Sequence, residues 1–495
     1  MVIKYGWMEV MGALFWLRRS PILAVIPTVA IPLTIIGVII SAIASFIAGL
    51  FGLELKWEGP KRLLEVFLKP RVIVAAILLN LIIWAGIKAY DYVSTMARPL
   101  TYVQLKNHFN ALPSDNRKYT DNIETPNIFE SIEGLTIKKI SALTQVWETK
   151  VPKGAFGGLV FSGTSMFFGS DDGNVYEMDP TDGKVLRKFY VGTSATPKVV
   201  IWNNLLFAGE GHHPTHHGRI YVFDLKFGTL KGVFQTKGHT EGPPMVYTVL
   251  GQSLLLVMAG SDGIYGVDPL TLKQVWHQKL GHVDSEARVE GNRIYFSRGV
   301  ERDFDVRDHK VYALEFSTGN VIWESDTGSS SWRAPIIFAD RVCWTFGEIF
   351  VKTKFGQVGC FDKTSGKPLT AVTLDGSSIG TPLRLGSSII TADLQGGICS
   401  IDPVTATRNW CADIPKGKYS YASANFDGYG NILFPTEKDG LVALDYKTGE
   451  KTFQWKPDDK QAPWGMVMSG IHVKDDEFYV IDWKGTVRKL KPVYQ

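Results

Sequence analysis

Histidine and carboxylate side chains gather in three short stretches between residues 210 and 284. The first, GEGHHPTHHG, carries one glutamate and four histidines: Glu210, His212, His213, His216 and His217. In the other two stretches a histidine precedes an acid by two residues, as His239 with Glu241 and His282 with Asp284. Imidazole together with carboxylate suits zinc, copper, nickel or manganese. We therefore expect a divalent metal site with the candidate ligands Glu210, His212, His239, Glu241, His282 and Asp284.

A different interpretation of these residues stays open. Histidines of a polar surface loop can lie in solvent or bond to backbone carbonyls, and we favour this for His216 and His217, because one loop cannot aim all its histidines inward. A second polar stretch mixes both signs of charge, as is typical of a solvated loop: Arg298, Glu301, Arg302, Asp303, Asp305, Arg307 and Asp308. A hydrolytic or redox reaction would also need an open coordination position and a base.

These stretches lie within an internal repeat that must position them. A seven-residue segment recurs as GNVYEMD, GRIYVFD, DGIYGVD, HKVYALE, GQVGCFD, GGICSID, DGLVALD and GTVRKLK. Successive copies end 40 to 47 residues apart, which is the length of a four-stranded antiparallel blade with short turns. The sequence therefore predicts an all-β, eight-bladed propeller with four-stranded blades over residues 140–495.

Each copy of the repeat carries its own packing signals. The final acid opens a turn by accepting backbone hydrogen bonds. Glycine follows four residues later at 183, 228, 319, 366 and 449, where a tight turn needs a positive φ. Tryptophan follows the acid by eight residues at 276, 323 and 410. We expect these indoles to fill the space between adjacent blades.

The ring needs a closing strand, because the last copy ends at Lys491, four residues before the final residue of the sequence. The segment 143–151, LTQVWETKV, has the character of the missing outer strand and would remove an open sheet edge. In such a ring, the loop between strands 2 and 3 and the link to the next blade lie on one face. The three histidine stretches are therefore expected to meet there.

The first hundred residues have a different character from the repeat. Residues 21–53 form thirty-three residues without a charge, where about 20 span a bilayer. A second apolar run favours another crossing at about 72–93. We expect an interfacial amphipathic helix over 1–19, two transmembrane helices within 20–95 and a linker over 96–139. Lysines and arginines between the two helices favour a cytoplasmic loop, which places the propeller in the periplasm of a bacterial inner membrane.

The repeat G-x-(V/I/L)-Y-x-(L/I/V)-D-x-x-T-G-x-x-x-W resembles that of the pyrroloquinoline-quinone-like propellers. This resemblance covers about residues 140–495 and implies a location outside the cytoplasm. The superfamily includes quinoprotein dehydrogenases and the propeller lipoprotein of the outer-membrane β-barrel assembly machine. Its enzymes hold their quinone against a disulfide between adjacent cysteines, beside calcium. Here Cys343, Cys360, Cys399 and Cys411 are all separated, which argues against pyrroloquinoline quinone as a cofactor.

The spacing of the cysteines leaves two states open. Cys399 and Cys411 fall on neighbouring strands of one hairpin, whereas Cys343 and Cys360 flank a longer loop. Either pair could form a disulfide in an oxidising compartment, and all four could remain buried thiols. We favour the Cys399–Cys411 bridge over the other, because the longer loop leaves the register of the second pair uncertain.

The composition and the repeat together favour a binding role. Fifty-three basic and 49 acidic residues give a net charge of +4, which offers no basic footprint for nucleic acid. We expect a membrane-anchored periplasmic propeller acting as a non-catalytic scaffold for protein interactions, with the lipid bilayer and an integral membrane or envelope complex as partners. The alternative is a membrane-bound quinone- or metal-dependent oxidoreductase, or a metal-dependent hydrolase, with its site at the mouth of the propeller channel.

Overall fold

The computed structural model describes residues 117–121, 127–192, 194–195, 198–211, 218–298, 309–347, 356–413, 422–437, 440–458 and 464–495. The chain divides into two units, Met1–Met96 and Ala97–Gln495. The expected interfacial helix and both expected transmembrane helices lie outside the described residues. Within the described ranges, no helical segment has the length and apolar character that a membrane crossing requires.

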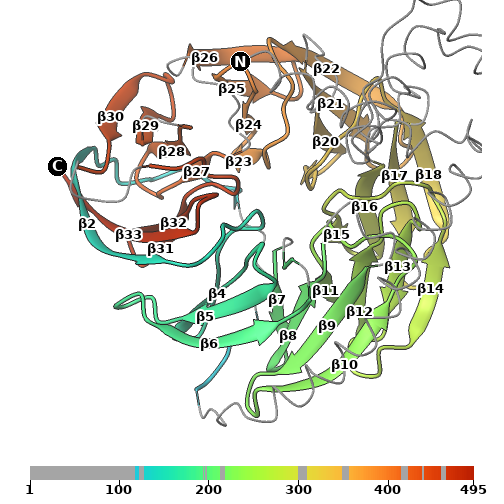
Figure 1. The fold of residues 1–495 in the computed structure, drawn as a ribbon. Helices are drawn as coiled ribbons and strands as arrows, with labels where there is room; N and C mark the ends of the chain where they lie inside the picture. The colour runs from blue at the N-terminus through green and yellow to red at the C-terminus, as the bar shows by residue number, and fades with distance from the viewer. Residues whose placement is uncertain are drawn as a thin grey trace, which may run out of the picture. The chain divides into compact units, whose positions relative to one another are not determined.

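The described strands form eight sheets that follow one another around a ring (Figure 1). Each sheet contains a set of four antiparallel strands that forms one blade of a propeller. In seven blades the four strands follow one another in the chain, and in the eighth the outer strand is β2. The first four blades comprise β3 (Val160–Ser162), β4 (Ser165–Gly169), β5 (Asn174–Met178) and β6 (Val185–Tyr190); β7 (Val200–Trp202), β8 (Leu205–Gly209), β9 (Arg219–Asp224) and β10 (Thr229–Gln235); β11 (Met245–Val249), β12 (Gln252–Met258), β13 (Ile264–Val267) and β14 (Gln274–Gln278); and β15 (Arg288–Glu290), β16 (Arg293–Arg298), β17 (Lys310–Glu315) and β18 (Val321–Asp326).

The remaining four blades complete the ring and confirm the predicted eight-bladed architecture. They comprise β19 (Ile336–Ile337), β20 (Arg341–Phe346), β21 (Gly356–Asp362) and β22 (Pro368–Leu374); β23 (Leu383–Leu385), β24 (Ser388–Ala392), β25 (Gly397–Asp402) and β26 (Thr407–Asp413); β27 (Asn425–Phe426), β28 (Asn431–Pro435), β29 (Leu441–Asp445) and β30 (Lys451–Trp455); and β31 (His472–Lys474), β32 (Glu477–Ile481), β33 (Thr486–Tyr494) and β2 (Ile140–Lys150). Every copy of the sequence repeat forms the third strand of its blade.

Ring closure occurs where the sequence predicted it. Strand β2 lies antiparallel to β33, with Ile140 opposite Tyr494 and Lys150 opposite Thr486 (Figure 1). The closing strand begins three residues earlier than the expected segment 143–151. Its Leu143 joins an apolar layer with Leu433 and Leu490, so the eighth blade is built from both ends of the described chain.

Neighbouring blades are joined by a tryptophan that docks on a glycine. The indole N–H of Trp276 in β14 donates to the carbonyl of Phe316 in the next blade at 3.0 Å. A Cβ atom at Gly319, whose φ is +72°, would lie 2.6 Å from the Trp276 ring. The same pair of contacts recurs between later blades, where Trp323 donates to the carbonyl of Lys363 and lies against Gly366. The predicted roles of the tryptophans and turn glycines are confirmed.

Parts of the expected linker contact the ring. Tyr119 donates a hydrogen bond to the buried carboxylate of Glu177 at 3.0 Å, and Thr120 exchanges hydrogen bonds with Ser162. Further along, the short strand β1 (Ile128–Phe129) pairs in parallel with β23 and gives the sixth sheet a fifth strand. The described part of this segment thus contacts the first blade and then the sixth.

Candidate functional site

The backbone around Val283 aims two side chains toward the same side. Val283 is fully buried and exchanges backbone hydrogen bonds of 3.1 and 2.9 Å with Gly260. Successive side chains of extended chain point to opposite sides. Because Val283 points into the core, His282 and Asp284 both face away from it. The β-bridge thus fixes the link between the third and fourth blades against the loop that follows β12.

A second link supplies His239 and is held on both sides of that residue. The Gly238 carbonyl accepts a 2.7 Å hydrogen bond from the N–H of Gly218. A Cβ at Gly238 would lie 1.8 Å from the Ala259 carbonyl, so only glycine permits this approach. On the other side, the Thr240 hydroxyl donates to the Glu210 carbonyl at 2.8 Å. His239 therefore sits at a fixed point of the link between the second and third blades.

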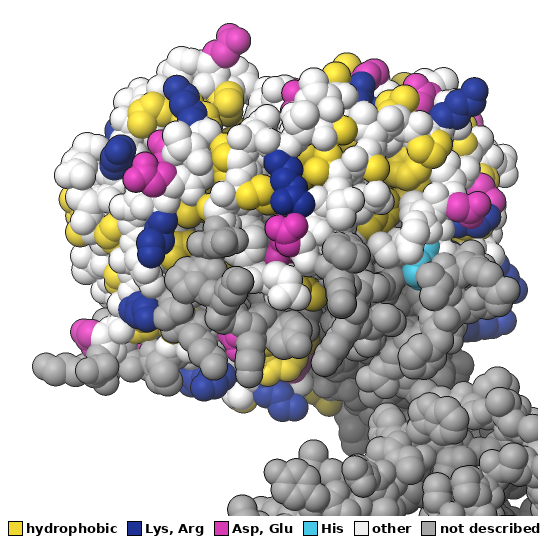
Figure 2. Space-filling view, turned by 90° about the horizontal axis from the view of Figure 1, so that it is seen from above, with side chains coloured by type: hydrophobic (Ala, Val, Ile, Leu, Met, Phe, Trp, Pro, Cys, Tyr) yellow, Lys and Arg dark blue, Asp and Glu magenta, His cyan; other side chains and the backbone are white. Residues whose placement is uncertain are grey.

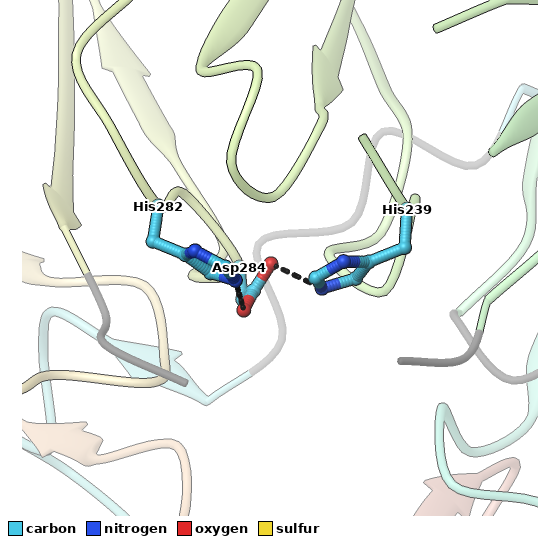
Figure 3. A group of neighbouring side chains, drawn as sticks. All are labelled: His239, His282 and Asp284. Carbon is cyan, nitrogen blue, oxygen red and sulfur yellow. Dashed lines mark ion pairs between the residues drawn. The ribbon is translucent and has the colours of Figure 1, made fainter. Parts of the chain in front are cut away.

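His239, His282 and Asp284 form a compact group, which we call the His–Asp cluster (Figure 3). One potential ligand atom from each residue lies within 4.8 Å of the others. Nε2 of His239 is 2.9 Å from Oδ1 of Asp284, and Nε2 of His282 is 3.6 Å from Oδ2. Figure 3 shows the two imidazoles approaching the carboxylate from opposite sides. Two imidazoles and a carboxylate are a donor set suited to zinc or another divalent transition metal.

The cluster is enclosed to different degrees. The Asp284 side chain is 1% exposed and the His239 side chain 5%, while His282 is 19% exposed. Neither carboxylate oxygen of Asp284 accepts a hydrogen bond of normal geometry from any residue in the described ranges. A buried carboxylate in this position needs a compensating positive charge. Among the residues that the structure describes, Asp284 forms ion pairs with the two imidazoles.

Glu241 lies at the edge of the cluster. Its Oε2 is 3.8 Å from Nε2 of His239, and its side chain is 25% exposed. It also interacts with Arg333, a partly buried residue on the link into the fifth blade. Burial lowers the pKa of Arg333, and the charges of Glu286 and Glu241 act in the opposite direction. Glu241 thus faces a histidine and is coupled to an arginine.

The other two predicted ligands are placed differently. Glu210 is buried, but its carboxylate lies 3.4 Å from the hydroxyl of Tyr221 and 3.9 Å from the Arg219 guanidinium, both on β9. Burial, followed by the Glu210 charge, raises the pKa of Tyr221 to about 12. The structure therefore brings together His239, His282 and Asp284, with Glu241 beside them. The carboxylate of Glu210 instead contacts Arg219 and Tyr221. His212 and the charged residues 301–308 lie outside the described residues.

Sequence reasoning missed the glycine behind the cluster. Gly260 has a φ of +50°, and a Cβ there would lie 2.6 Å from Cε1 of His239. It also missed Arg288, whose pKa burial lowers, with Tyr247 and Glu286 acting in the opposite direction. The run AGSDG before the third repeat copy was a signal for the glycine, because two glycines in one short loop mark close approaches of the backbone.

The cysteines are placed unlike those of the quinone enzymes that the repeat resembles. Cys343 bonds to Cys360 across β20 and β21, and Cys399 bonds to Cys411 across β25 and β26. Both disulfides join residues that lie opposite each other on neighbouring strands of one blade. The strand register of Cys343 and Cys360, which the sequence left open, therefore permits their bridge as well as the Cys399–Cys411 bridge. The residues present do not reproduce an adjacent cysteine pair, and we derive no quinone chemistry for this chain.

Two curated proteins resemble parts of this chain. The tetrathionate hydrolase of Acidithiobacillus ferrooxidans is 24% identical over 215 residues, which span 39% of this chain and 41% of that enzyme. The match therefore covers less than half of the enzyme's length. The outer membrane protein assembly factor BamB of Burkholderia pseudomallei is 23% identical over 335 residues, spanning 63% of this chain and 82% of that protein.

Solved structures share the fold at low sequence identity. BamB from Moraxella catarrhalis superimposes with a TM-score of 0.54 at 14% identity, covering 71% of this chain and 100% of that chain. A quinohemoprotein alcohol dehydrogenase from Pseudomonas putida HK5 gives 0.51 at 14% identity, covering 70% and 76%. At such identities the likeness concerns the fold alone.

The family profile described as outer membrane protein assembly factor BamB matches residues 200–343 and 307–457. These overlapping matches run from the first strand of the second blade to beyond the last strand of the seventh. Together with the eight four-stranded blades and the closing strand, they show that this chain belongs to the BamB-like family of pyrroloquinoline-quinone-like β-propellers.

Proposed function

We propose that this protein is a membrane-anchored propeller that serves as an interaction scaffold in an envelope complex. The observation that carries the proposal is the extent of the family match. The alignment to the Burkholderia assembly factor takes in 82% of that protein, whereas the alignment to the tetrathionate hydrolase takes in 41% of that enzyme. A scaffold depends on the whole ring, and it is the assembly factor that is matched along most of its length.

The outer rim of the ring supports this role. Val275 in β14, Ile322 in β18 and Leu369 in β22 occupy the same position of the repeat, and each is between 42 and 46% exposed. We call these three residues the aliphatic row. Figure 1 shows their strands at the outer edge of three successive blades. Each of the three blades thus presents one exposed aliphatic side chain at the same repeat position, and we propose that a protein partner spanning the blades contacts all three.

The surface charge favours the same class of partner. Figure 2 shows one side of the molecule, on which Lys and Arg side chains lie singly among acidic and apolar ones. Binding to nucleic acid depends on basic residues gathered into a stripe or patch. A protein partner does not need such a patch, because interfaces between proteins combine an apolar centre with a polar rim.

The proposed compartment is the periplasm, with the anchor in the bacterial inner membrane. Its support comes from the two disulfides, which persist in oxidising compartments, and from the two apolar runs of the first hundred residues. A cysteine introduced at Ser114 should react with a membrane-impermeant maleimide in intact spheroplasts. Labelling only after lysis would place the propeller in the cytoplasm and overturn this part of the proposal.

The scaffold role is tested by purification of the full chain from membranes in a mild detergent. The wild-type chain should carry a stoichiometric partner, and Ile322→Lys should reduce the recovered partner at least tenfold. Val146→Lys is the matched control, because Val146 is 48% exposed at the equivalent position of the eighth blade. A wild-type chain without partners, or equal loss in both variants, would refute a role for the aliphatic row.

A metal-dependent reaction at the ring is a second candidate function, and the His–Asp cluster is the observation that favours it. His282, which is 19% exposed beside the buried carboxylate, gives a substrate access to an ion bound there. The similarity to a tetrathionate hydrolase makes hydrolysis the first reaction class to assay. Turnover that disappears in Asp284→Asn but not in Ile322→Lys would support this candidate over the scaffold.

A further inference from the structure

We propose that the His–Asp cluster binds one divalent transition-metal ion, with zinc the best match, which ties together the links entering the third and fourth blades. The inference is independent of the scaffold role, because the cluster and the aliphatic row are different groups of residues. Its first support is the identity of the donors. Two imidazole nitrogens and one carboxylate form a mixed nitrogen and oxygen set that zinc accepts and that calcium and magnesium do not favour.

The spacing of the donors agrees with this ion. Zinc bonds nitrogen and oxygen at about 2.0 to 2.2 Å, which sets ligand atoms of a tetrahedron roughly 3.4 Å apart. The two histidine-to-aspartate separations are 2.9 and 3.6 Å, on either side of that value. All three donors lie within 4.8 Å of one another. Three of four tetrahedral positions would be completed if the donors drew together, the widest pair by up to about 1.4 Å.

The charge of Asp284 supplies an independent reason for an ion at this point. Its side chain is 1% exposed, and its oxygens accept no hydrogen bond of normal geometry within the described part of the chain. Within the described residues, the ion pairs of Asp284 are those with His239 and His282. A divalent cation between the three side chains would neutralise the carboxylate while both imidazoles stay in their ligating, neutral form.

The backbone holds the donors without leaving them free to spread apart. Val283 is bridged to Gly260, and His239 lies over the same Gly260, so one residue contacts both ligand-bearing links. Because sites on fixed backbone bind metals with less ordering cost, this arrangement favours a site that exists before the ion arrives. The carboxylate of Glu241, whose Oε2 is 3.8 Å from Nε2 of His239, lies at the edge of the proposed site.

The test uses the full-length protein stripped with a chelator and then dialysed. A titration with zinc, monitored by calorimetry, should show one binding site per chain. Cobalt bound in place of zinc should show the visible absorption of a tetrahedral site with nitrogen and oxygen ligands. Asp284→Asn and His282→Gln should each weaken zinc binding at least a hundredfold. Zinc should also raise the midpoint of thermal unfolding of the wild type and leave that of Asp284→Asn unchanged, which separates loss of the site from misfolding.

The matched control is His277→Gln. His277 lies in the third blade and is 13% exposed, but it stacks on Tyr265 and contacts the Asp262 carbonyl. This variant should bind zinc as the wild type does. Three results would overturn the proposal: a folded wild-type chain that binds less than about a tenth of an equivalent, undiminished binding by Asp284→Asn and His282→Gln, or equal loss of binding in His277→Gln. Binding with an unchanged partner profile would leave the scaffold role intact.

Discussion

Replacement of Gly319 by alanine tests whether tryptophan docking sets the stability of the blade interface. Gly319 combines two restrictions, a φ of +72° and a neighbouring ring of Trp276 that a Cβ would approach to 2.6 Å. The left-handed conformation costs an alanine about 1 to 2 kcal/mol. Crowding in a well-packed interior adds about 1 to 3 kcal/mol. We therefore expect Gly319→Ala to lower the free energy of unfolding by roughly 2 to 5 kcal/mol.

The same blade offers a control that separates the two restrictions. Gly291 has a φ of +54°, and a Cβ there would meet nothing within 4 Å. Gly291→Ala should therefore show only the conformational cost, about 1 to 2 kcal/mol. The difference between the variants, about 1 to 3 kcal/mol, measures the contact with the indole.

The assay is urea unfolding of the full chain followed by far-ultraviolet circular dichroism, which does not depend on the mutated tryptophan. Midpoints are compared at an unchanged slope. In a Trp276→Leu background the excess cost of Gly319→Ala should fall below about 1 kcal/mol, because the clashing ring is gone. Equal costs for Gly319→Ala and Gly291→Ala, or an excess that persists without the indole, would refute the docking argument.

Three other perturbations probe the ring. Trp147→Ala should lower the free energy of unfolding by about 2 to 3 kcal/mol, because the indole N–H bonds the Pro180 carbonyl of the first blade; the exposed Val493→Ala should cost less than about 0.5 kcal/mol, and equal effects would contradict closure at this blade. Peptide mapping without reductant should recover both disulfides, whereas four thiols open to alkylation after denaturation would disprove them. Desolvation and the charge of Lys198 lower the pKa of His472 to about 3. Between about pH 6.5 and 3 the unfolded chain therefore binds a proton that the folded chain does not. The free energy of unfolding consequently decreases as the pH is lowered through this range, by at most about 1.4 kcal/mol per pH unit. His472→Gln should flatten that slope, and an unchanged slope would exclude His472 as its source.

The repeat made most of the ring predictable from the sequence. Period, turn glycine and tryptophan all act within one blade or between neighbours, so local spacing carries them. The closing strand was also predictable, because a missing fourth strand leaves one unfilled place. By contrast, the parallel pairing of β1 with β23 joins residues some 250 positions apart and has no local signal.

The candidate site was predictable in part for a similar reason. His239, His282 and Asp284 occupy links at equivalent places in successive blades, and ring geometry brings such links together. Glu210 lies on a neighbouring loop, but the direction of its side chain depends on competition between possible partners. In the structure the Glu210 carboxylate contacts Arg219 and Tyr221 on β9. No spacing rule reports which way a side chain rotates.

The pairing of β2 with β33 has a consequence for how the chain folds as it is made. Residue 486 emerges 336 residues after Lys150, which corresponds to roughly 17 to 67 s at about 5 to 20 residues per second. During this interval β2 lacks β33, its one strand partner in the described sheet, and unpaired strands can join other chains. Glu148 and Lys150 are charged residues at the C-terminal end of β2. They would discourage such encounters while synthesis continues. In the finished ring Glu148 pairs with the buried Arg488 and Lys150 donates to the Thr486 hydroxyl, so the same two charges serve first the nascent chain and then the closed blade.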